Sequence, residues 1–326
     1  MPDQGEGTSI PLRVLGRSGM RVSELCLGAM TFGTEWGFGA DEETCREIYR
    51  VFRDAGGNFV DTANIYNEGA SEAIVGRLIA KERDAIVLST KYTLLADKEN
   101  PNSGGSHRKS LRCAVEGSLR RLGTDYVDLL WVHAWDQCTP ADETLRALDD
   151  LVRAGTVLAV GVSNTPAWVV SRSQAIADLR GWSAFCAIQL EYSLVARTPE
   201  RELLPMARAL GLSPWAWSPL ARGLLTGKRR GDSAPPSPAA QRALTVTTEV
   251  AAELGATPAQ VALAWLRRQG VSPVIGARTV AQLRDNLGAL DVSFDDEQLR
   301  RLDAATRVRR GYPHDFLDRH RATLAL

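Results

Sequence analysis

Apolar residues along the chain form short continuous runs that alternate with longer amphipathic stretches. Continuous apolar runs are typical of strands that are buried on both faces of a parallel sheet. Strands are expected at residues 25–30, 59–63, 85–91, 126–133, 157–163, 185–191, 213–218 and 271–277. Helices are expected at residues 41–55, 70–81, 107–122, 140–154, 165–179, 199–210, 245–269 with a break near Gly255 and Pro258, and 279–290.

The first of these helices carries clear start and stop signals. Asp41 is a good N-cap, and Glu42 and Glu43 follow it in the first turn, where negative charge is favoured. Gly56 and Gly57 lie just past the expected end, where a left-handed residue usually closes a helix. The pattern therefore predicts a helix with both ends defined.

A strand followed by a helix, repeated eight times, predicts an α/β protein with a parallel sheet covered by helices. The length of 326 residues would also fit two average domains. A closed (β/α)₈ barrel, the TIM barrel, is favoured because it accounts for nearly the whole chain, residues 1–326, as one domain.

Segments outside the repeat have their own expected places. Residues 11–24 contain two short β-like pieces around Gly19 and are expected to form a hairpin that plugs the N-terminal end of the barrel. Residues 294–306 suggest one extra helix, and the tail at 309–326 has little regular pattern. The stretch 228–241 contains three prolines and is expected to be a mobile loop.

Composition limits the classes of partner. The hydrophobic fraction of 44% and the charged fraction of 24% are typical of a soluble globular protein. The 39 basic residues balance 39 acidic ones, which argues against nucleic acid as a partner. The first ten residues do not resemble a secretory signal, and no apolar run approaches the ~20 residues of a membrane-spanning helix. A cytoplasmic protein with no membrane partner and five reduced cysteines is expected, and its oligomeric state is left open.

Four residues with complementary chemistry lie at or just beyond the expected strands. Asp61 ends the second strand, Lys91 the third and His133 the fourth, and Tyr66 follows five residues after Asp61. Catalytic residues of a (β/α)₈ barrel lie at the C-terminal ends of its strands and in the loops that follow. A phenol near an ammonium, a carboxylate and an imidazole can act as a proton donor.

The chain resembles the aldo-keto reductase family over residues 11–317. The likeness is carried by GAMTFG (28–33), FVDTANIY (59–66), STKY (89–92), VHAWD (132–136), GVSN (161–164), QLEYSLVAR (189–197), AWSPLARGLLTGK (216–228) and GARTVAQLRDN (276–286). This resemblance implies a (β/α)₈ barrel that binds NADPH and reduces aldehydes and ketones. It also implies that Tyr66 is the general acid, and that Asp61, Lys91 and His133 complete a catalytic tetrad.

Elementary chemistry supports these roles. A free phenol titrates near ~10, and a nearby Lys91 is expected to lower that pKa. Asp61 would keep Lys91 charged and oriented. His133 would orient the carbonyl group of the substrate and help to relay the proton.

The resemblance also assigns a cofactor site. It implies that Ser163, Asn164 and Gln189 contact the nicotinamide carboxamide and that Trp217 stacks on the ring. Asp61 is implied as a cofactor contact as well. The implied pyrophosphate contacts are Ser218, Pro219, Leu220, Ala221, Arg222, Gly223 and Lys228, and those at the adenosine end are Gly276, Arg278, Gln282, Asp285 and Asn286. NADPH is preferred over NADH because Arg278 offers a planar fork for the extra phosphate. Gly276 replaces a lysine that one branch of the family carries.

Other cofactor chemistry finds no motif in the sequence. No G-x-G-x-x-G or G-x-S-x-G motif occurs, and GLLTGKR (223–229) departs from a Walker loop. The four histidines are dispersed, so no metal is required. Met30, Phe32, Trp36 and Trp135 are expected to line the substrate pocket, joined by Tyr66 and by Tyr312 or Phe316 from the tail. Such a pocket favours apolar carbonyl compounds.

Three functions remain open from the sequence. The favoured one is an NADPH-dependent reductase of small-molecule carbonyl compounds. The second is a regulatory barrel that binds the cofactor with little turnover, because the β subunits of potassium channels resemble the same family. The third is a lyase in which Lys91 forms a Schiff base with the substrate.

Overall fold

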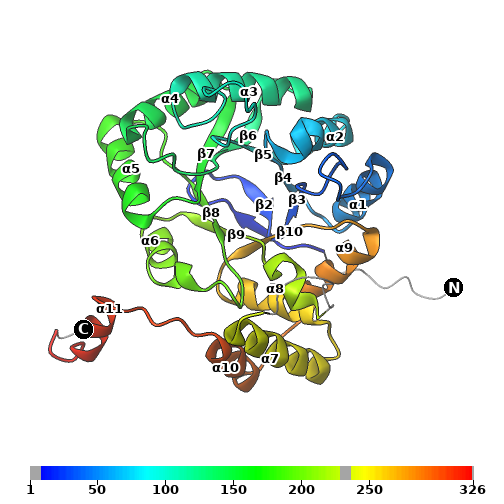
Figure 1. Ribbon diagram of the computed structural model, residues 1–326, viewed down its shortest axis with the longest axis vertical. Helices are drawn as coiled ribbons and strands as arrows, with labels where there is room; N and C mark the ends of the chain where they lie inside the picture. Colours follow the sequence, from blue (N-terminus) through cyan, green and yellow to red (C-terminus); the bar gives the residue numbers. More distant parts are fainter. Residues whose placement is uncertain (1–8, 228–235, 325–326) are drawn as a thin grey trace.

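The computed structural model describes residues 9–227 and 236–324. Eight parallel strands close into a barrel in the order β10, β3, β4, β5, β6, β7, β8, β9, and helices surround it (Figure 1). The (β/α)₈ architecture predicted from the sequence is therefore confirmed. The strands are β3 (Cys26–Gly28), β4 (Phe59–Asp61), β5 (Val87–Tyr92), β6 (Val127–Val132), β7 (Val157–Ser163), β8 (Ala187–Glu191), β9 (Ser213–Trp217) and β10 (Ser272–Ile275).

The predicted helices are present with small shifts at their ends. The first is capped as expected, since the Asp41 side chain accepts a hydrogen bond from the backbone N–H of Thr44. Among the described helices, none combines the length and apolar composition that a membrane crossing needs. The α-helices are α1 (Glu42–Asp54), α2 (Ala70–Ile79), α3 (Arg108–Leu122), α4 (Ala141–Arg153), α5 (Ala167–Arg180), α6 (Leu203–Ala209), α7 (Pro238–Leu254), α8 (Pro258–Arg268), α9 (Val280–Leu287), α10 (Asp296–Ala305) and α11 (His314–Arg319). The short 3₁₀ turns are η1 (Tyr66–Gly69), η2 (Arg83–Ala85), η3 (Thr198–Glu200), η4 (Ala221–Thr226) and η5 (Gly288–Leu290).

Two segments differ from the sequence prediction. Helix α7 begins at Pro238, inside the stretch 228–241 that was expected to be a loop, because Ser237 caps it and proline is tolerated in a first helical turn. Residues 228–235 of that stretch lie outside the described residues. The tail, which showed little pattern, contains the short helix α11 and lies against the start of α6, where Arg201 donates to the carbonyl of Arg310 at 2.9 Å.

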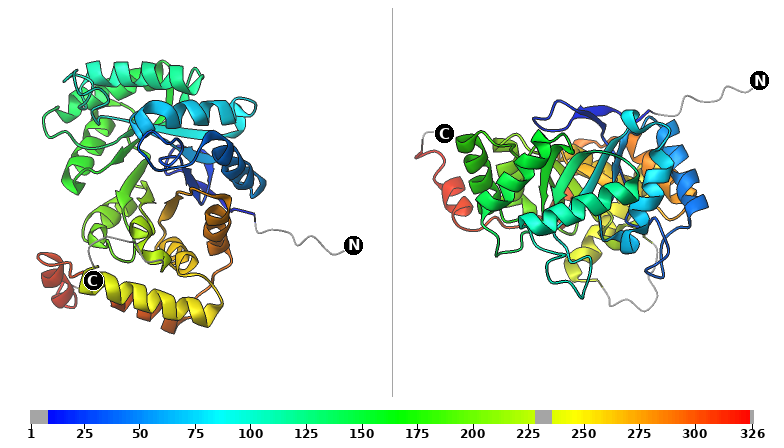
Figure 2. Two further views of the ribbon diagram at one scale, coloured as in Figure 1. Left: turned by 45° about the vertical axis from the view of Figure 1, so that its right-hand side comes forward. Right: turned by 90° about the horizontal axis from the view of Figure 1, so that it is seen from above.

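A hairpin closes the N-terminal end of the barrel, as predicted. Strands β1 (Leu12–Val14) and β2 (Arg21–Ser23) pair antiparallel and lie across that end (Figure 2). Leu15 and Val22 are fully buried in one apolar cluster with Phe59 and Trp215, whose rings meet edge to face with centroids 4.8 Å apart. The lower part of the barrel is therefore filled by side chains.

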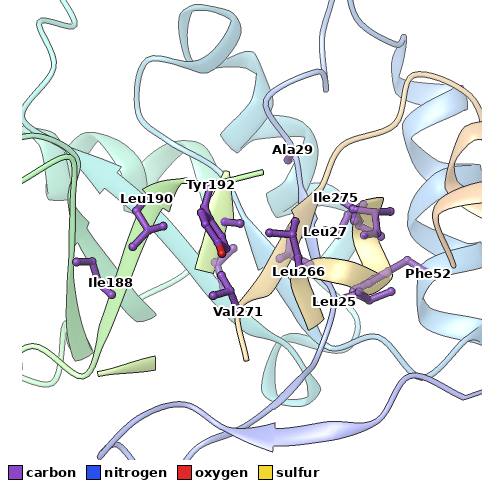
Figure 3. Close-up of a cluster of buried hydrophobic side chains, with 14 of the residues drawn as sticks. Leu25, Leu27, Ala29, Phe52, Ile188, Leu190, Tyr192, Leu266, Val271 and Ile275 are labelled. Atoms are coloured by element: carbon purple, nitrogen blue, oxygen red, sulfur yellow. The ribbon is translucent and has the colours of Figure 1, made fainter. Parts of the chain in front are cut away.

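A second and larger apolar core lies between the barrel and the helices. Leu27 and Ile275 from the strands, and Leu25 just before β3, pack there with Phe52 of α1 and Leu266 of α8 (Figure 3). Successive residues of a strand point to opposite faces, so the neighbour of Leu25 and Leu27, Cys26, belongs to the inner cluster instead. This alternation decides which polar residues face the barrel interior at the C-terminal ends of the strands.

Candidate active site

A buried ion pair lies at the centre of the site. Asp61 ends β4 and pairs in register with Ser89 of the neighbouring strand β5. The Lys91 ammonium donates to Asp61 Oδ2 and, at 2.8 Å, to the carbonyl oxygen of Thr62. Ser89 donates to the other carboxylate oxygen, Oδ1, at 2.6 Å. All three side chains are buried, so the position of the ammonium is fixed by hydrogen bonds on each side.

Tyr66 and His133 complete the group. The Lys91 Nζ lies 4.7 Å from the centre of the Tyr66 ring. His133, the residue directly after β6, meets the same ring nearly edge to face, with ring centroids 6.0 Å apart. The structure thus brings together the four residues that the sequence singled out, from the ends of three strands and the turn η1.

The charges of this group differ in part from expectation. Burial raises the pKa of the Tyr66 phenol above its ordinary value, and this effect outweighs the lowering by Lys91 that the sequence suggested. Burial would lower the pKa of Lys91, but Asp61 and Tyr66 together bring it above its ordinary value. The site therefore holds a protonated phenol beside a charged ammonium.

His133 is neutral in this environment. Burial, and then the charge of Lys91, lower the pKa of its imidazole to about 3. Its Nδ1 is buried and has no hydrogen-bond partner within the described part of the chain. A neutral imidazole has one donor and one acceptor nitrogen, so the ring can donate a hydrogen bond to a bound oxygen.

The residues expected at the nicotinamide end also converge. Ser163 ends β7 and pairs in register with Gln189 of β8, and both side chains are buried. Asn164 donates to the His133 carbonyl at 2.8 Å and accepts from the Trp217 indole at 3.2 Å. One amide therefore links the main chain at His133 to the indole at the end of β9.

The loop after β9 has a strained backbone. Ser218, Ala221 and Arg222 adopt left-handed conformations, with φ of 52°, 49° and 55°. Such residues cost about 1–3 kcal/mol each and cluster at functional sites. The backbone N–H of Arg222 is held by Ser218 Oγ at 3.1 Å. Successive left-handed residues can turn several N–H groups to one side, an arrangement suited to phosphate oxygens. Pro219, Leu220 and Gly223 belong to the same loop, whereas Lys228 lies outside the described residues.

The residues expected at the adenosine end gather around the start of α9. Gln282 accepts from the backbone N–H of Arg278 at 2.8 Å, and Asn286 donates to the Gly276 carbonyl at 3.3 Å. Asp285 does not bond this segment. Its carboxylate accepts a hydrogen bond of 2.8 Å from Thr257, the N-cap of α8, and so connects α8 with α9. A Cβ atom at Gly276 would meet only the carbonyl oxygen of Gly28, at 4.0 Å.

Arg278 is the feature of this end that best fits a phosphate. Its side chain is exposed at the N-terminus of α9 and pairs with no carboxylate in residues 9–227 and 236–324. A free guanidinium at a helix N-terminus is a favourable environment for an anion. Together with the polar groups at the barrel mouth and the strained loop after β9, it makes the site suitable for a nicotinamide dinucleotide.

The expected substrate residues have different surroundings. The Trp36 ring meets Tyr66 nearly edge to face, with centroids 6.1 Å apart, and Met30 is exposed nearby in sequence. Phe32 is fully buried in the core between the barrel and the helices, so it supports the loop from behind. Trp135 packs on Trp168 of α5, and both line a separate cavity of about 230 Å³ between α4 and α5.

The tail residues lie at the surface. Tyr312 is 85% exposed and Phe316 is 45% exposed. The tail is fixed near α6, where His314 Nε2 and Glu202 Oε1 are 2.8 Å apart. The expected contribution of Tyr312 or Phe316 to the substrate pocket stays a prediction.

Three supporting residues were missed by sequence reasoning. Ser89 holds Asp61, Asn67 bonds the loop after β3, and Phe38 packs against Trp36 with ring centroids 6.0 Å apart. Ser89 precedes Lys91 by two residues and so lies on the same face of β5, a signal that could have identified it. Within the described residues, no three His, Cys, Asp or Glu side chains gather where they could hold a metal ion.

Comparison with known proteins shows the family of the chain. A sequence model of the Aldo/keto reductase family matches residues 24–307. Norsolorinic acid reductase stcV of Emericella nidulans is 40% identical, over 92% of this chain and 82% of its own length. The uncharacterized oxidoreductase YrpG of Bacillus subtilis is 42% identical, over 88% and 93% respectively. Aryl-alcohol dehydrogenase GME11368 of Pestalotiopsis microspora is 35% identical, over 94% and 86%. With a closed barrel, a converged tetrad and a family match over most of its length, the chain belongs to the aldo/keto reductase family.

Proposed function

We propose that this protein reduces aldehydes and ketones to alcohols with NADPH, and that Tyr66 is the general acid. The observation that carries the proposal is the position of the Tyr66 ring, 4.7 Å from the ammonium of Lys91, which is itself paired with buried Asp61. Membership of the family supports carbonyl reduction with a nicotinamide cofactor in general. The cofactor preference and the residue roles are the finer part of the proposal.

The protein residues divide the proton chemistry among them. Tyr66 donates its proton to the carbonyl oxygen, and the charge of Lys91 stabilises the phenolate that remains. Asp61 keeps Lys91 charged and in place. Neutral His133 donates a hydrogen bond that orients the carbonyl group. A positioned general acid of this type supplies about 10²–10⁴ in rate.

The cofactor is held by residues around the mouth of the barrel. When bound, the reduced nicotinamide supplies the hydride. Ser163, Asn164 and Gln189 present donors and acceptors that suit its carboxamide, and Trp217 offers a ring face for stacking. The exposed guanidinium of Arg278 suits the additional phosphate of NADPH, which NADH lacks.

Aromatic carbonyl compounds are the substrate class that the surroundings of Tyr66 favour. Trp36 stands edge-on to the phenol, and Phe38 extends the aromatic surface. One of the relatives carries a name that refers to an aromatic substrate, an aryl alcohol. Polarised ring edges and faces attract a planar aromatic group more than a short aliphatic chain.

The environment of Lys91 disfavours the lyase alternative. A Schiff base requires a neutral amine that a substrate can reach. Lys91 is fully buried, and Asp61 and Tyr66 raise its pKa above the ordinary value. Lys91 is therefore better suited to stabilise charge than to act as a nucleophile.

The proposal is tested by NADPH oxidation with 2-naphthaldehyde and butanal. Wild-type protein should consume NADPH, and Tyr66→Phe should lose most of that activity while it binds NADPH nearly as tightly. Tyr126→Phe is a matched control, because Tyr126 lies just before β6, at the opposite end of that strand from His133, and its hydroxyl contacts Asp84. Full turnover in Tyr66→Phe would reject Tyr66 as the acid. Tight NADPH binding without turnover of any carbonyl compound would favour the regulatory barrel, and borohydride trapping of substrate on Lys91 would favour the lyase.

A further inference from the structure

The loop after β3, residues 29–40, forms a closed unit beside Tyr66. Its two sides are joined by backbone hydrogen bonds, from Gly33 N–H to the Ala40 carbonyl at 2.9 Å and from Ala40 N–H to the Thr31 carbonyl at 2.8 Å. The loop carries Trp36 and Phe38, whose rings pack together, and Trp36 meets the phenol of Tyr66. The loop thus supplies one aromatic wall of the space in front of the proton donor.

Ser71 and Cys45 bond the two ends of this loop, at Ala29 and Ala40, and the buried side chain of Asn67 holds the part between them. The Asn67 amide nitrogen donates to the carbonyl oxygens of Met30 at 2.9 Å and Phe32 at 3.2 Å. Its amide oxygen accepts from the backbone N–H of Trp36 at 3.2 Å. Asn67 has no exposed surface, so these bonds are shielded from water. They span the loop from its start to the residue that forms the wall.

The backbone of Asn67 shows why asparagine suits this position. Its φ and ψ are 45° and 47°, a left-handed conformation that glycine and asparagine adopt most readily. Glycine would satisfy the backbone equally well but could not bond the loop. Asn67 meets both requirements, because it accepts the turn and also provides three hydrogen bonds.

Asn67 also follows Tyr66 directly in the chain. The residue that fixes the aromatic wall is therefore covalently attached to the residue that carries the phenol. Any shift of the loop relative to Asn67 is also a shift relative to Tyr66. This connection therefore contributes directly to the distance between the indole and the phenol.

We infer that Asn67 is a positioning residue that fixes the Trp36 wall and makes the site selective for planar aromatic carbonyl compounds. The inference rests on the proposed reductase function. An aromatic substrate bound at Tyr66 needs the indole at a definite distance and angle to gain from ring contact. A short aliphatic aldehyde makes no such contact, so it is indifferent to the exact position of the wall.

The test compares Asn67→Gly with Trp36→Ala and with the double variant. Glycine preserves the left-handed turn and removes the three hydrogen bonds. The variant therefore tests the effect of the Asn67 side chain without a change in backbone conformation. In Asn67→Gly we expect KM for 2-naphthaldehyde to rise about tenfold with a smaller change in kcat, while KM for butanal changes less than about twofold. NADPH affinity should stay unchanged.

The double variant shows whether Asn67 acts through Trp36. If it does, Asn67→Gly combined with Trp36→Ala should have nearly the same KM for 2-naphthaldehyde as Trp36→Ala alone. Additive effects would overturn the inference, as would equal losses for 2-naphthaldehyde and butanal. A wild-type protein that reduces neither aldehyde would instead reject the proposed function, and the inference with it. When the wild type reduces both aldehydes, the proposed function stands. The selectivity of Asn67→Gly then tests the inference about Asn67 by itself.

Discussion

Ser89 donates a hydrogen bond of 2.6 Å to the oxygen of Asp61 that Lys91 leaves free. The carboxylate is thereby held from two sides inside the barrel, and its orientation does not depend on the lysine alone. Asp61 and Lys91 are both held by neighbours of this kind, which can be tested by substitution.

Removal of the Ser89 hydroxyl should destabilise the protein. In Ser89→Ala the Oδ1 of Asp61 loses a buried hydrogen bond, and we expect the free energy of unfolding to fall by about 1–3 kcal/mol. Urea denaturation measures this change. Ser213→Ala is the matched control, because the Ser213 hydroxyl is also buried but has no hydrogen-bond partner among the described residues. An equal loss in both variants would show that the bond to Asp61 contributes nothing.

Removal of the Lys91 charge alone should lower the free energy of unfolding more than removal of the whole ion pair. Lys91→Met leaves Asp61 buried without its partner, and one-sided loss of a buried pair destabilises proteins by about 3–5 kcal/mol. Lys91→Met combined with Asp61→Asn should recover a large part of this loss, because no buried charge remains. Denaturation of the wild type, both single variants and the double variant completes the cycle. A double variant less stable than Lys91→Met would contradict the expectation.

The neutral state of His133 should appear in the acid stability of the protein. Its folded pKa is lowered to about 3, whereas an unfolded histidine titrates near ~6.5. The unfolded chain therefore binds an extra proton first as the pH falls below ~6.5, and stability declines progressively towards pH 3 at about 1.4 kcal/mol per pH unit. His133→Gln should lack this component. Urea denaturation of both proteins between pH 7 and pH 4 should show that their difference in free energy of unfolding changes with pH. If that difference were constant over the whole range, the assignment of a lowered pKa to His133 would be contradicted.

Arg278 should distinguish the two nicotinamide cofactors. Arg278→Ala removes the guanidinium available for the extra phosphate, so we expect NADPH affinity to fall at least about tenfold while NADH affinity falls by less than about twofold. Titration of protein fluorescence with each cofactor measures both. Arg284→Ala is the control, because Arg284 is an exposed arginine in the last turn of the same helix α9. Similar losses for both cofactors would remove the case for NADPH over NADH.

The barrel, and the convergence of Asp61, Lys91 and His133 at its mouth, could be predicted from the sequence because both depend on local periodicity. Continuous apolar runs locate the strands, and Asp61, Lys91 and His133 sit where those runs end. The raised pKa of Tyr66 could not be foreseen, because the balance between burial and the charge of Lys91 depends on tertiary packing. The same holds for Asn67, whose bonds reach a loop more than thirty residues earlier in the chain, and for the pairing of Trp135 with Trp168.

The hairpin that closes the N-terminal end of the barrel limits how ligands can enter and leave. Leu15 and Val22 pack with Phe59 and Trp215 and fill that end. The described part of the barrel is thus shaped like a cup and not like a tube. A dinucleotide and a carbonyl compound would both have to enter through the C-terminal opening of the barrel. Whichever of them binds deeper would therefore have to bind first and dissociate last.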